Sequence, residues 1–184
     1  LAGLARRIFY DFQWQAWNYL KPRRYPNFAT HRPYPIIAEY ATWAVRLAKL
    51  GWRRRQAEAV TARLLEGHRP FFLFPLQLDT DSQIRVHSSF GRLTRAIEAV
   101  IIDFAAHAPM AAVLVLKNHP LDNGWIDYRR LVHRLARARG VEERVQFIDG
   151  GPLEALIDHA EGIVTVNSTV GMTALERRST VICL

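Results

Sequence analysis

The stretch LVLKNHPLDNG, residues 114–124, decides how the rest of the chain is interpreted. An apolar run ends in a lysine, an asparagine and a His-Pro pair, which is typical of a buried strand that leaves the core at its carboxyl end. Pro120 restricts the backbone of His119 to extended geometry. Two interpretations stay open: an ordinary polar turn, or an imidazole that faces a ligand at the edge of a parallel sheet.

The same alternation of apolar runs and helical patterns continues on both sides of this stretch. Apolar runs at 70–77, 111–117, 144–149, 162–167 and 179–184 predict five strands, and the segments between them predict four helices. Ser88 or Ser89 is a candidate cap for the first of these helices, and Gly140 is expected to end the second. Strands that alternate with helices in this way predict an α/β fold with a parallel sheet.

The net charge of +8 is concentrated in the first part of the chain. Residues 1–69 hold 13 Lys/Arg against 4 Asp/Glu, a net +9, whereas residues 70–184 hold 12 against 13, a net −1. The charge of the second part therefore argues against a nucleic-acid-binding protein. For the first part, two interpretations stay open: a helical connector whose aromatic residues pack on the following domain, or a basic, Trp-rich surface that contacts anionic lipid headgroups.

The cysteine content and the chain ends give further expectations. Cys183 is the only cysteine, which excludes a disulfide framework and favours a reducing cytosol. No signal peptide opens the sequence, and the most apolar window, residues 96–116, contains Glu98, Asp103 and Pro109, so we do not expect it to span a bilayer. The chain begins on Leu1 and stops within a predicted strand, so we expect it to be part of a longer protein.

A polar loop, QLDTDSQIRVHSSF at 77–90, directly follows the first apolar run. The carboxylate of Asp79 or Asp81 could act there as a general base or a nucleophile. The alternative is a hydrophilic loop whose aspartates form local turns. The further candidate binding residues of this loop are Gln77, Gln83, Arg85 and Ser89.

A second polar loop, VNSTVGMTAL at 166–175, follows the fourth apolar run. Asn167, Ser168 and Thr169 precede a predicted helix that begins near Val170, and the free N–H groups of a helix start can bind an anion. The alternative is a plain Ser/Thr cap. Because the carboxyl ends of parallel strands meet at one edge, we expect both loops to converge with His119 around a phosphate-bearing ligand.

Five motifs in order resemble those of the bacterial capsule polysaccharide biosynthesis and export proteins. They are PLQ-x-D-x-DSQ, SSF, K-x-HP-x-D, FIDGGPLEALI and VTVNSTVGMTAL, and they lie within residues 70–184. Within that family the motifs look most like those of the capsule β-Kdo transferases, which build a lipid-linked Kdo linker. Residues 1–69 resemble the family more loosely, through the HRP element at 31–33 and the basic helix.

This resemblance implies an architecture and a reaction. Residues 70–184 would be the Rossmann-like, nucleotide-sugar-binding C-terminal half of a GT-B-type glycosyltransferase, truncated at its C-terminus. Residues 1–69 would be a basic, mostly helical connector or a remnant of the N-terminal domain. The donor would be CMP-Kdo, transferred to a phospholipid-linked or glycolipid acceptor, with no metal and no other cofactor.

The resemblance also assigns roles to individual residues. CMP would be bound by Lys117, His119, Asn167, Ser168, Thr169 and Gly171. Asp81 is the expected catalytic carboxylate, with Asp79 as its rival and His119 beside the reacting phosphate. Related transferases retain the anomeric configuration, so Asp81 would be a nucleophile that forms a covalent sugar–enzyme species.

The chain departs from the family pattern at two places, and two other functions stay open. Arg178-Ser179-Thr180 stands where the family usually has Gly-Lys-Pro, and Met172-Thr173 stands where an acidic residue is common. The alternatives are a non-catalytic capsule export or assembly factor and a nucleotide-sugar epimerase of the same fold. The expected location is cytoplasmic, peripheral at the inner face of the inner membrane, with the export machinery as a partner and no nucleic acid.

Overall fold

The computed structural model describes residues 6, 9–14, 16–17, 36–67 and 69–184. Contacts between Cα atoms divide the chain into two compact units, Leu1–Pro33 and Tyr34–Leu184. The described residues of the first unit are helical. The HRP element at 31–33 lies outside the described residues. The division by contacts falls at Pro33/Tyr34 rather than at 69/70, because helices α2 (Ile36–Ala48) and α3 (Leu50–Glu66) join the second unit.

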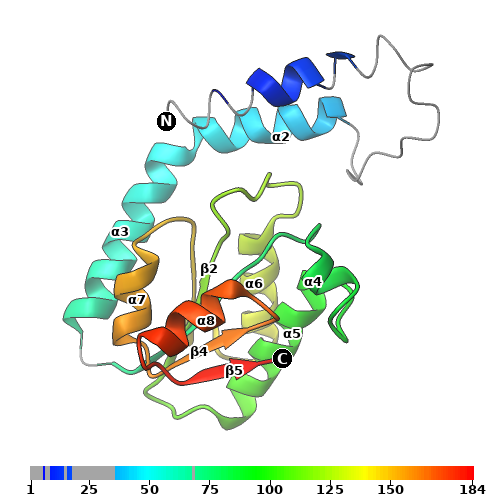
Figure 1. Cartoon of the computed structure of the whole chain (residues 1–184). Coiled ribbons are helices and arrows are strands. Elements are labelled where there is room, and N and C mark those ends of the chain that lie inside the picture. Colours follow the sequence, from blue (N-terminus) through cyan, green and yellow to red (C-terminus); the bar gives the residue numbers. More distant parts are fainter. Residues whose placement is uncertain (1–5, 7–8, 15, 18–35, 68) are drawn as a thin grey trace. The chain divides into compact units, whose positions relative to one another are not determined.

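Residues 69–184 contain a sheet of five parallel strands (Figure 1). The strands are β1 (Phe71–Pro75), β2 (Val113–Lys117), β3 (Val145–Ile148), β4 (Gly162–Thr165) and β5 (Val181–Cys183). Their spatial order is β3-β2-β1-β4-β5. The α/β fold with a parallel sheet that the sequence predicted is therefore confirmed. The chain moves outward from β1 to β3 and then returns to the other side of β1, which creates a switch point between β1 and β4.

The helices of this region lie between the strands, as the hydrophobic periodicity predicted. They are α4 (Ser82–Arg85), α5 (Leu93–His107), α6 (Tyr128–Ala138), α7 (Leu153–His159) and α8 (Thr169–Glu176), with a short 3₁₀ helix, η2 (Glu142–Arg144), before β3. Gly140 ends α6 with φ +67°, and Val141 N donates to Ala136 O at 3.0 Å, the bond of a Schellman motif. The prediction for Gly140 is confirmed.

The start of α5 differs from the sequence-based prediction. The helix begins at Leu93, not beside Ser88 or Ser89. Ser88 Oγ instead donates to the carbonyl oxygen of Ile84 at 2.6 Å, at the end of α4. The N–H of Leu93 donates to the carboxylate of Asp79 at 3.0 Å. The capping group of α5 is therefore a distant aspartate, which a search for a neighbouring serine overlooks.

Two hydrophobic cores cover the two faces of the sheet, because successive side chains of a strand point to opposite sides. All five residues of β2 are buried: Leu114 and Leu116 belong to the core that α5 and α6 cover, while Val113 and Val115 belong to the core that includes Ala57 of α3 and residues of α7 and α8. Burying such a side chain contributes about 1.5–3 kcal/mol. The sheet is thus held between two helical layers.

Two glycines let α3 approach the loop that follows β3. Gly150 and Gly151 have φ of +149° and +81°. A Cβ atom on Gly150 would lie 3.3 Å from the Cβ of Ala57, and one on Gly151 would lie 2.8 Å from Oγ1 of Thr61. A side chain at Gly151 would therefore collide with α3, so this helix rests directly on the loop at the carboxyl end of β3.

Candidate functional site

The loops singled out in the sequence begin at the carboxyl edge of the sheet, where backbone pairing continues past the strands. Leu76 N donates to Lys117 O, and Asn118 N donates to Ile148 O, both at 2.8 Å. These bonds join the first residue after β1 to the end of β2, and the first residue after β2 to the end of β3. The loops after β1 and β2 therefore start from one fixed edge, as the rule for parallel sheets led us to expect.

Asp79 is occupied by structural contacts. Its Oδ1 accepts the hydrogen bond from Leu93 N, and its Oδ2 lies 3.5 Å from Nη2 of Arg85. Nε of Arg85 also donates to the backbone oxygen of Asp79 at 2.8 Å. Both carboxylate oxygens thus have partners that fix the start of α5 and the end of α4. This arrangement favours a structural role for Asp79 and for Arg85.

Asp81 is the N-cap of α4, a helix of four residues that the sequence analysis treated as loop. Its Oδ1 accepts a hydrogen bond from Gln83 N at 2.9 Å. The described part of the chain supplies no hydrogen bond to its Oδ2. The residue is half-buried. Asp81 therefore has one oxygen held by the backbone and a second that remains open to a ligand.

His119 lies in the loop after β2 with its ring orientation fixed. Nδ1 accepts a hydrogen bond from Leu121 N at 3.1 Å, so the proton of the neutral ring lies on Nε2. Partial burial lowers the pKa of His119, and the positive charges of Lys117 and Arg46 lower it further, whereas the charge of Asp81 raises it. At neutral pH the ring is therefore an uncharged hydrogen-bond donor, and Asp81 is near enough to act on it electrostatically.

Lys117 is the last residue of β2 and is only 6% exposed. Burial lowers the pKa of its ammonium, and the opposing charge of Asp149 offsets part of this effect. The described residues offer the ammonium no hydrogen bond. A buried amine beside His119, without a hydrogen-bond partner of its own, is suited to an anionic ligand group.

The loop after β4 is joined to the loop after β1. Asn167 has φ +50°, and its Nδ2 donates to the backbone oxygen of His87 at 2.9 Å. Ser168 caps α8, with its Oγ accepting from Val170 N at 3.3 Å. Thr169 is the exposed first residue of the helix. The capping interpretation of Ser168 is thus realised, and the exposed helix start faces the same edge.

The other candidates occupy different environments. Gly171 is buried, and a Cβ there would lie 3.1 Å from Cγ2 of Thr165, so this glycine lets α8 pack on β4. Gln77 is buried immediately after β1, while Gln83 and Ser89 are exposed in the loop. The charges of Asp81 and Lys117 thus both act on His119, and Asn167 is bonded to the loop after β1. Gly171 serves packing.

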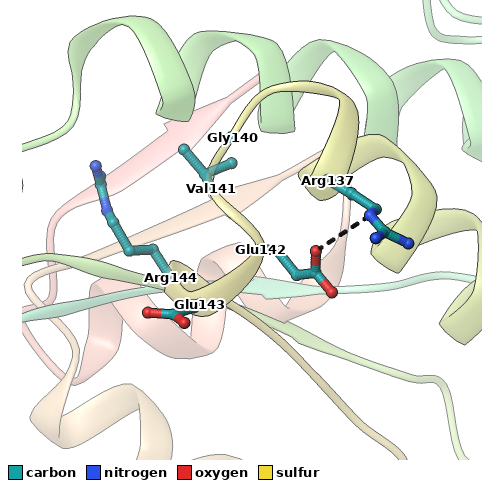
Figure 2. A pocket seen from close by; sticks show the side chains of 6 residues that line it. All are labelled: Arg137, Gly140, Val141, Glu142, Glu143 and Arg144. Carbon is teal, nitrogen blue, oxygen red and sulfur yellow. Dashed lines mark ion pairs between the residues drawn. The ribbon is translucent and has the colours of Figure 1, made fainter.

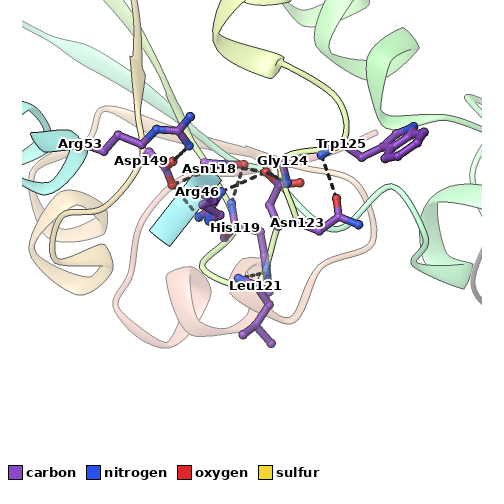
Figure 3. Close-up of polar contacts among 10 residues, drawn as sticks. Arg46, Arg53, Asn118, His119, Leu121, Asn123, Gly124, Trp125 and Asp149 are labelled. Atoms are coloured by element: carbon purple, nitrogen blue, oxygen red, sulfur yellow. Dashed lines mark hydrogen bonds and ion pairs between the residues drawn. The ribbon is translucent and has the colours of Figure 1, made fainter. Parts of the chain in front are cut away.

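A buried ionic network that the sequence analysis missed lies next to His119 (Figure 3). Nη2 of Arg46, on α2, lies 2.8 Å from Oδ1 of Asp149, and Nη1 lies 3.1 Å from Oδ2 of Asp122. Arg53 of α3 pairs with Oδ2 of Asp149 at 2.8 Å. Nδ2 of Asn118 donates to Asp122 at 3.1 Å and to Asp149 at 3.3 Å.

The sequence contained one signal for this network. Arg46 interrupts the apolar stretch ATWAVRLA at 41–48, and a lone charge in an apolar helix is a candidate for a buried ion pair. Its partners could not be inferred from spacing, because Asp122 and Asp149 lie 76 and 103 residues away. Asp122 and Asp149 were part of the quoted motifs but received no role.

A surface hollow lies elsewhere (Figure 2). Its lining residues are Arg137, Gly140, Val141, Glu142, Glu143 and Arg144, and within it Nε of Arg137 pairs with Glu142 at 3.8 Å. These residues precede β3, at the amino end of the strands. The hollow therefore does not coincide with the loops at the carboxyl edge.

Two searches of the described residues were negative. No cluster of three or more His, Cys, Asp or Glu side chains there has an arrangement suited to a metal ion. Among the helices that the structure describes, none combines the length and the apolarity needed to cross a membrane.

Comparison with known proteins gives relatives that are named for capsule polysaccharide export and modification. The chain is 32% identical over 164 residues to the capsule polysaccharide export protein KpsS of Escherichia coli, covering 86% of this chain and 41% of that protein. It is 33% identical over 157 residues to the capsule polysaccharide modification protein LipB of Neisseria meningitidis serogroup B, covering 84% of this chain and 37% of LipB. The chain thus spans about two fifths of the length of these curated relatives.

A solved structure and a family model complete the comparison. The β-Kdo 2,7-transferase KpsC of Thermosulfurimonas dismutans matches with a TM-score of 0.47 at 17% identity, over 74% of this chain and 45% of that one. The model of the family described as "Capsule polysaccharide biosynthesis protein" matches residues 2–184. Since that match covers nearly the whole chain, the protein belongs to the capsule polysaccharide biosynthesis protein family.

Proposed function

We propose that this chain forms the nucleotide-binding half of a GT-B-type glycosyltransferase that moves Kdo from CMP-Kdo to a phospholipid-linked acceptor during assembly of the capsule linker. The observation that carries the proposal is that Asp81 and His119 lie in the loops after the neighbouring strands β1 and β2, at one edge of the sheet, where the charge of Asp81 acts on His119. The relatives are named for capsule polysaccharide export and modification, which supports the pathway. The choice of donor rests on the motif resemblance given above.

The chemistry of the edge fits the departure of a nucleotide. When the sugar leaves CMP-Kdo, negative charge develops on the phosphate of CMP. Nε2–H of His119, the ammonium of Lys117 and the N–H of Thr169 at the start of α8 are three kinds of donor for that charge. We assign the phosphate to this group of donors, with Asn167, Ser168 and Thr169 lining the helix start.

Asp81 is our choice of catalytic carboxylate. Its free Oδ2 would attack the anomeric carbon as CMP leaves, giving a covalent sugar–enzyme species, and the acceptor hydroxyl would then displace the carboxylate with net retention. Asp79 is the less suitable candidate because both of its carboxylate oxygens have partners. Gln77 and Gln83 flank the two aspartates and are candidate contacts of the sugar hydroxyls. We expect no metal to be required, so transfer should withstand EDTA.

Nucleotide binding gives the first test. We expect CMP to raise the melting temperature of the protein and UDP to leave it unchanged, since a ligand stabilises the state that binds it. The variant His119→Ala should lose most of the CMP effect. Stabilisation by UDP alone would favour a nucleotide-sugar epimerase and contradict the proposal.

Transfer to a lipid acceptor gives the second test. With the full-length protein, CMP-Kdo and a lysophospholipid acceptor, Asp81→Asn should abolish transfer and allow a trapped Kdo–enzyme adduct to be sought in the wild type by mass spectrometry. Asp79→Asn is the matched control and should keep measurable activity if it remains folded. Equal activity of wild type and Asp81→Asn would remove the nucleophile from the proposal.

A second function has one specific observation in its favour. The E. coli relative is named an export protein, so a non-catalytic assembly factor on the same fold is the alternative. If the protein is such a factor, no Kdo transfer should occur with any lipid acceptor, whether or not the protein binds CMP. Transfer activity therefore distinguishes the two functions.

We also propose that the enzyme works at the inner face of the inner membrane. The described residues 9–14 and 16–17 expose Phe9, Tyr10, Phe12, Trp14 and Trp17, each about half accessible, in the segment that carries the net positive charge. Aromatic and basic side chains together favour the interface of an anionic bilayer. Sedimentation with phosphatidylglycerol vesicles, but not with phosphatidylcholine vesicles, is the expected result.

A further inference from the structure

We propose that Arg46, on helix α2, is the positioning residue that holds the His119 loop in its working geometry. The effect of Arg46 on transfer rests on the function proposed above, whereas its effect on the geometry of the loop does not. Arg46 is 4% exposed and reaches three acceptors at the carboxyl edge of the sheet. These are the carboxylates of Asp122 and Asp149 and the backbone oxygen of His119, the last at 3.4 Å from Nη2.

The contacts of Arg46 enclose the loop from both ends. Asp122 is three residues beyond His119, and its Oδ2 accepts from Arg46, from Asn118 and from Gly124 N, which lies 3.2 Å away. The N–H of His119 donates to Oδ1 of Asn118 at 3.0 Å, and the N–H of Asp122 donates to His119 O at 3.1 Å. One guanidinium therefore touches the carbonyl of His119 and the carboxylate that organises the rest of the loop.

The chemistry of this position requires arginine. A guanidinium presents several N–H groups in one plane and can contact three acceptors at once, while a lysine ammonium is a point charge on a flexible chain. Burial raises the pKa of Asp122, although the hydrogen bond from Asn118 and the charge of Arg46 oppose this. Arg46 thus compensates the charge of a buried carboxylate and fixes the loop with the same group.

Arg53 is a matched control within the same network. It lies on the neighbouring helix α3 and pairs with the same carboxylate, that of Asp149, at the same 2.8 Å. It has no contact with Asp122 or with the His119 loop in the described structure. A lysine at position 53 therefore tests the general cost of weakening the network, and a lysine at position 46 tests the positioning of His119.

The first experiment measures loop geometry in the full-length protein by amide hydrogen exchange. The N–H of Leu121 is bonded to Nδ1 of His119, so its exchange rate reports whether the ring is held. We expect Arg46→Lys to accelerate exchange at Leu121 by about tenfold, and Arg53→Lys to leave it within about twofold of wild type. Unchanged exchange at Leu121 in folded Arg46→Lys would overturn the inference.

The second measurement is the pKa of His119 by NMR in histidine-labelled protein. The charged groups that act on this ring are Lys117 on β2, Arg46 on α2 and Asp81 at the start of α4. Arg46→Met removes a positive charge, so the pKa of His119 should rise toward its ordinary value of 6.5. Arg46→Lys keeps the charge and should move the pKa less. If neither Arg46 variant folds, Asp122→Asn weakens the same contact from the other side and should likewise accelerate exchange at Leu121.

Transfer kinetics separate this inference from the proposed function. We expect Arg46→Lys to lower kcat by about 10- to 100-fold with KM for the donor within about twofold, because a misplaced group loses transition-state contacts first. Faster exchange at Leu121 with unchanged kcat would support the positioning by Arg46 and contradict the catalytic role of His119. Unchanged exchange at Leu121 together with full activity of Arg46→Lys would contradict the positioning role of Arg46 but not the proposed function.

Discussion

The two halves of the sheet's carboxyl edge are built in different ways. After β2 and β3, the charged side chains are buried and bound to one another: Asp122 and Asp149 share Arg46 and Asn118. After β1 and β4, two half-buried side chains cap the helices that directly follow them: Asp81 caps α4 and Ser168 caps α8. In the first half, arginines from α2 and α3 bind the carboxylates. In the second half, the capping side chains bind backbone N–H groups of the helices that directly follow them.

This difference separates rigidity from access. A buried ion network fixes geometry but leaves no room for a ligand. A capping side chain uses one acceptor atom to bind the helix, and its other polar atoms remain accessible. His119 lies where the two halves meet. We therefore expect changes to the β2–β3 half to reduce stability most, and changes to the β1–β4 half to reduce binding most.

The largest effect is expected from Asp149→Ala. This carboxylate is 4% exposed and accepts from Arg46, Arg53 and Asn118, so its removal leaves Arg46 buried with less compensation. We expect a loss of about 3–5 kcal/mol in the free energy of unfolding, measured by urea denaturation. Asp158→Ala, which removes an exposed partner of Arg177, is the control and should change stability little. Equal effects of the two variants would remove the contrast between the halves.

A smaller effect is expected from Gly151→Ala, in the loop on which α3 rests. The change strains a backbone at φ +81° and places a Cβ 2.8 Å from Oγ1 of Thr61. We expect a loss of about 1–3 kcal/mol. Gly140→Ala has a similar φ of +67° with nothing within 4 Å of the new Cβ, so it measures strain alone. The difference between the two losses, measured by urea denaturation, is the cost of the contact with Thr61. Equal losses would show that this contact costs nothing.

Ser168→Ala tests the other half of the edge. Loss of the cap of α8 should cost about 1 kcal/mol of stability, seen as a lower midpoint in thermal or urea unfolding. Ser89→Ala, at an exposed loop serine, is the control and should be neutral. Because we assign Ser168 to the CMP site, Ser168→Ala should also lower the affinity for CMP, by more than the loss of folding stability explains. An unchanged CMP affinity would restrict Ser168 to capping.

The smallest effect concerns the pH dependence that Lys117 contributes. Its pKa is lowered in the folded protein, so the unfolded chain binds more protons below the ordinary value of 10.5. Stability should therefore rise as the pH increases toward 10.5, and Lys117→Met should flatten this rise and be no less stable at pH 7. Urea midpoints between pH 7 and pH 10 provide the measurement. An unchanged slope in the variant would show that Lys117 is not desolvated.

The sequence predicted the features that depend on neighbours in the chain. The apolar runs predicted the five strands, and the segments between them predicted helices that include α5, α6, α7 and α8. It missed α4, because four residues around a capping aspartate carry no periodicity. It also placed the start of α5 beside Ser88 or Ser89, because the group that binds Leu93 N lies 14 residues away in Asp79.

The site divides in the same way. The edge rule for parallel sheets led to Asp81, His119 and the loop at 166–175 without any knowledge of contacts. The partners of Arg46 and Arg53 lie 73 to 103 residues from them, so no local pattern could identify them. Sequence reasoning therefore identified loop residues at the carboxyl edge of the sheet and overlooked the two arginines, Arg46 and Arg53, that bind the loops after β2 and β3.

The burial of Arg46 has a consequence for dissecting the protein. An excised domain that begins at Pro70 would contain every strand of the sheet, yet it would lack the two cations that neutralise Asp122 and Asp149. Those buried carboxylates would lack their compensating charges, and the loop that carries His119 would lose its contacts with Arg46. Helices α2 and α3 thus supply the counterions of these carboxylates, and a module that keeps both arginines with their whole helices starts near Ile36.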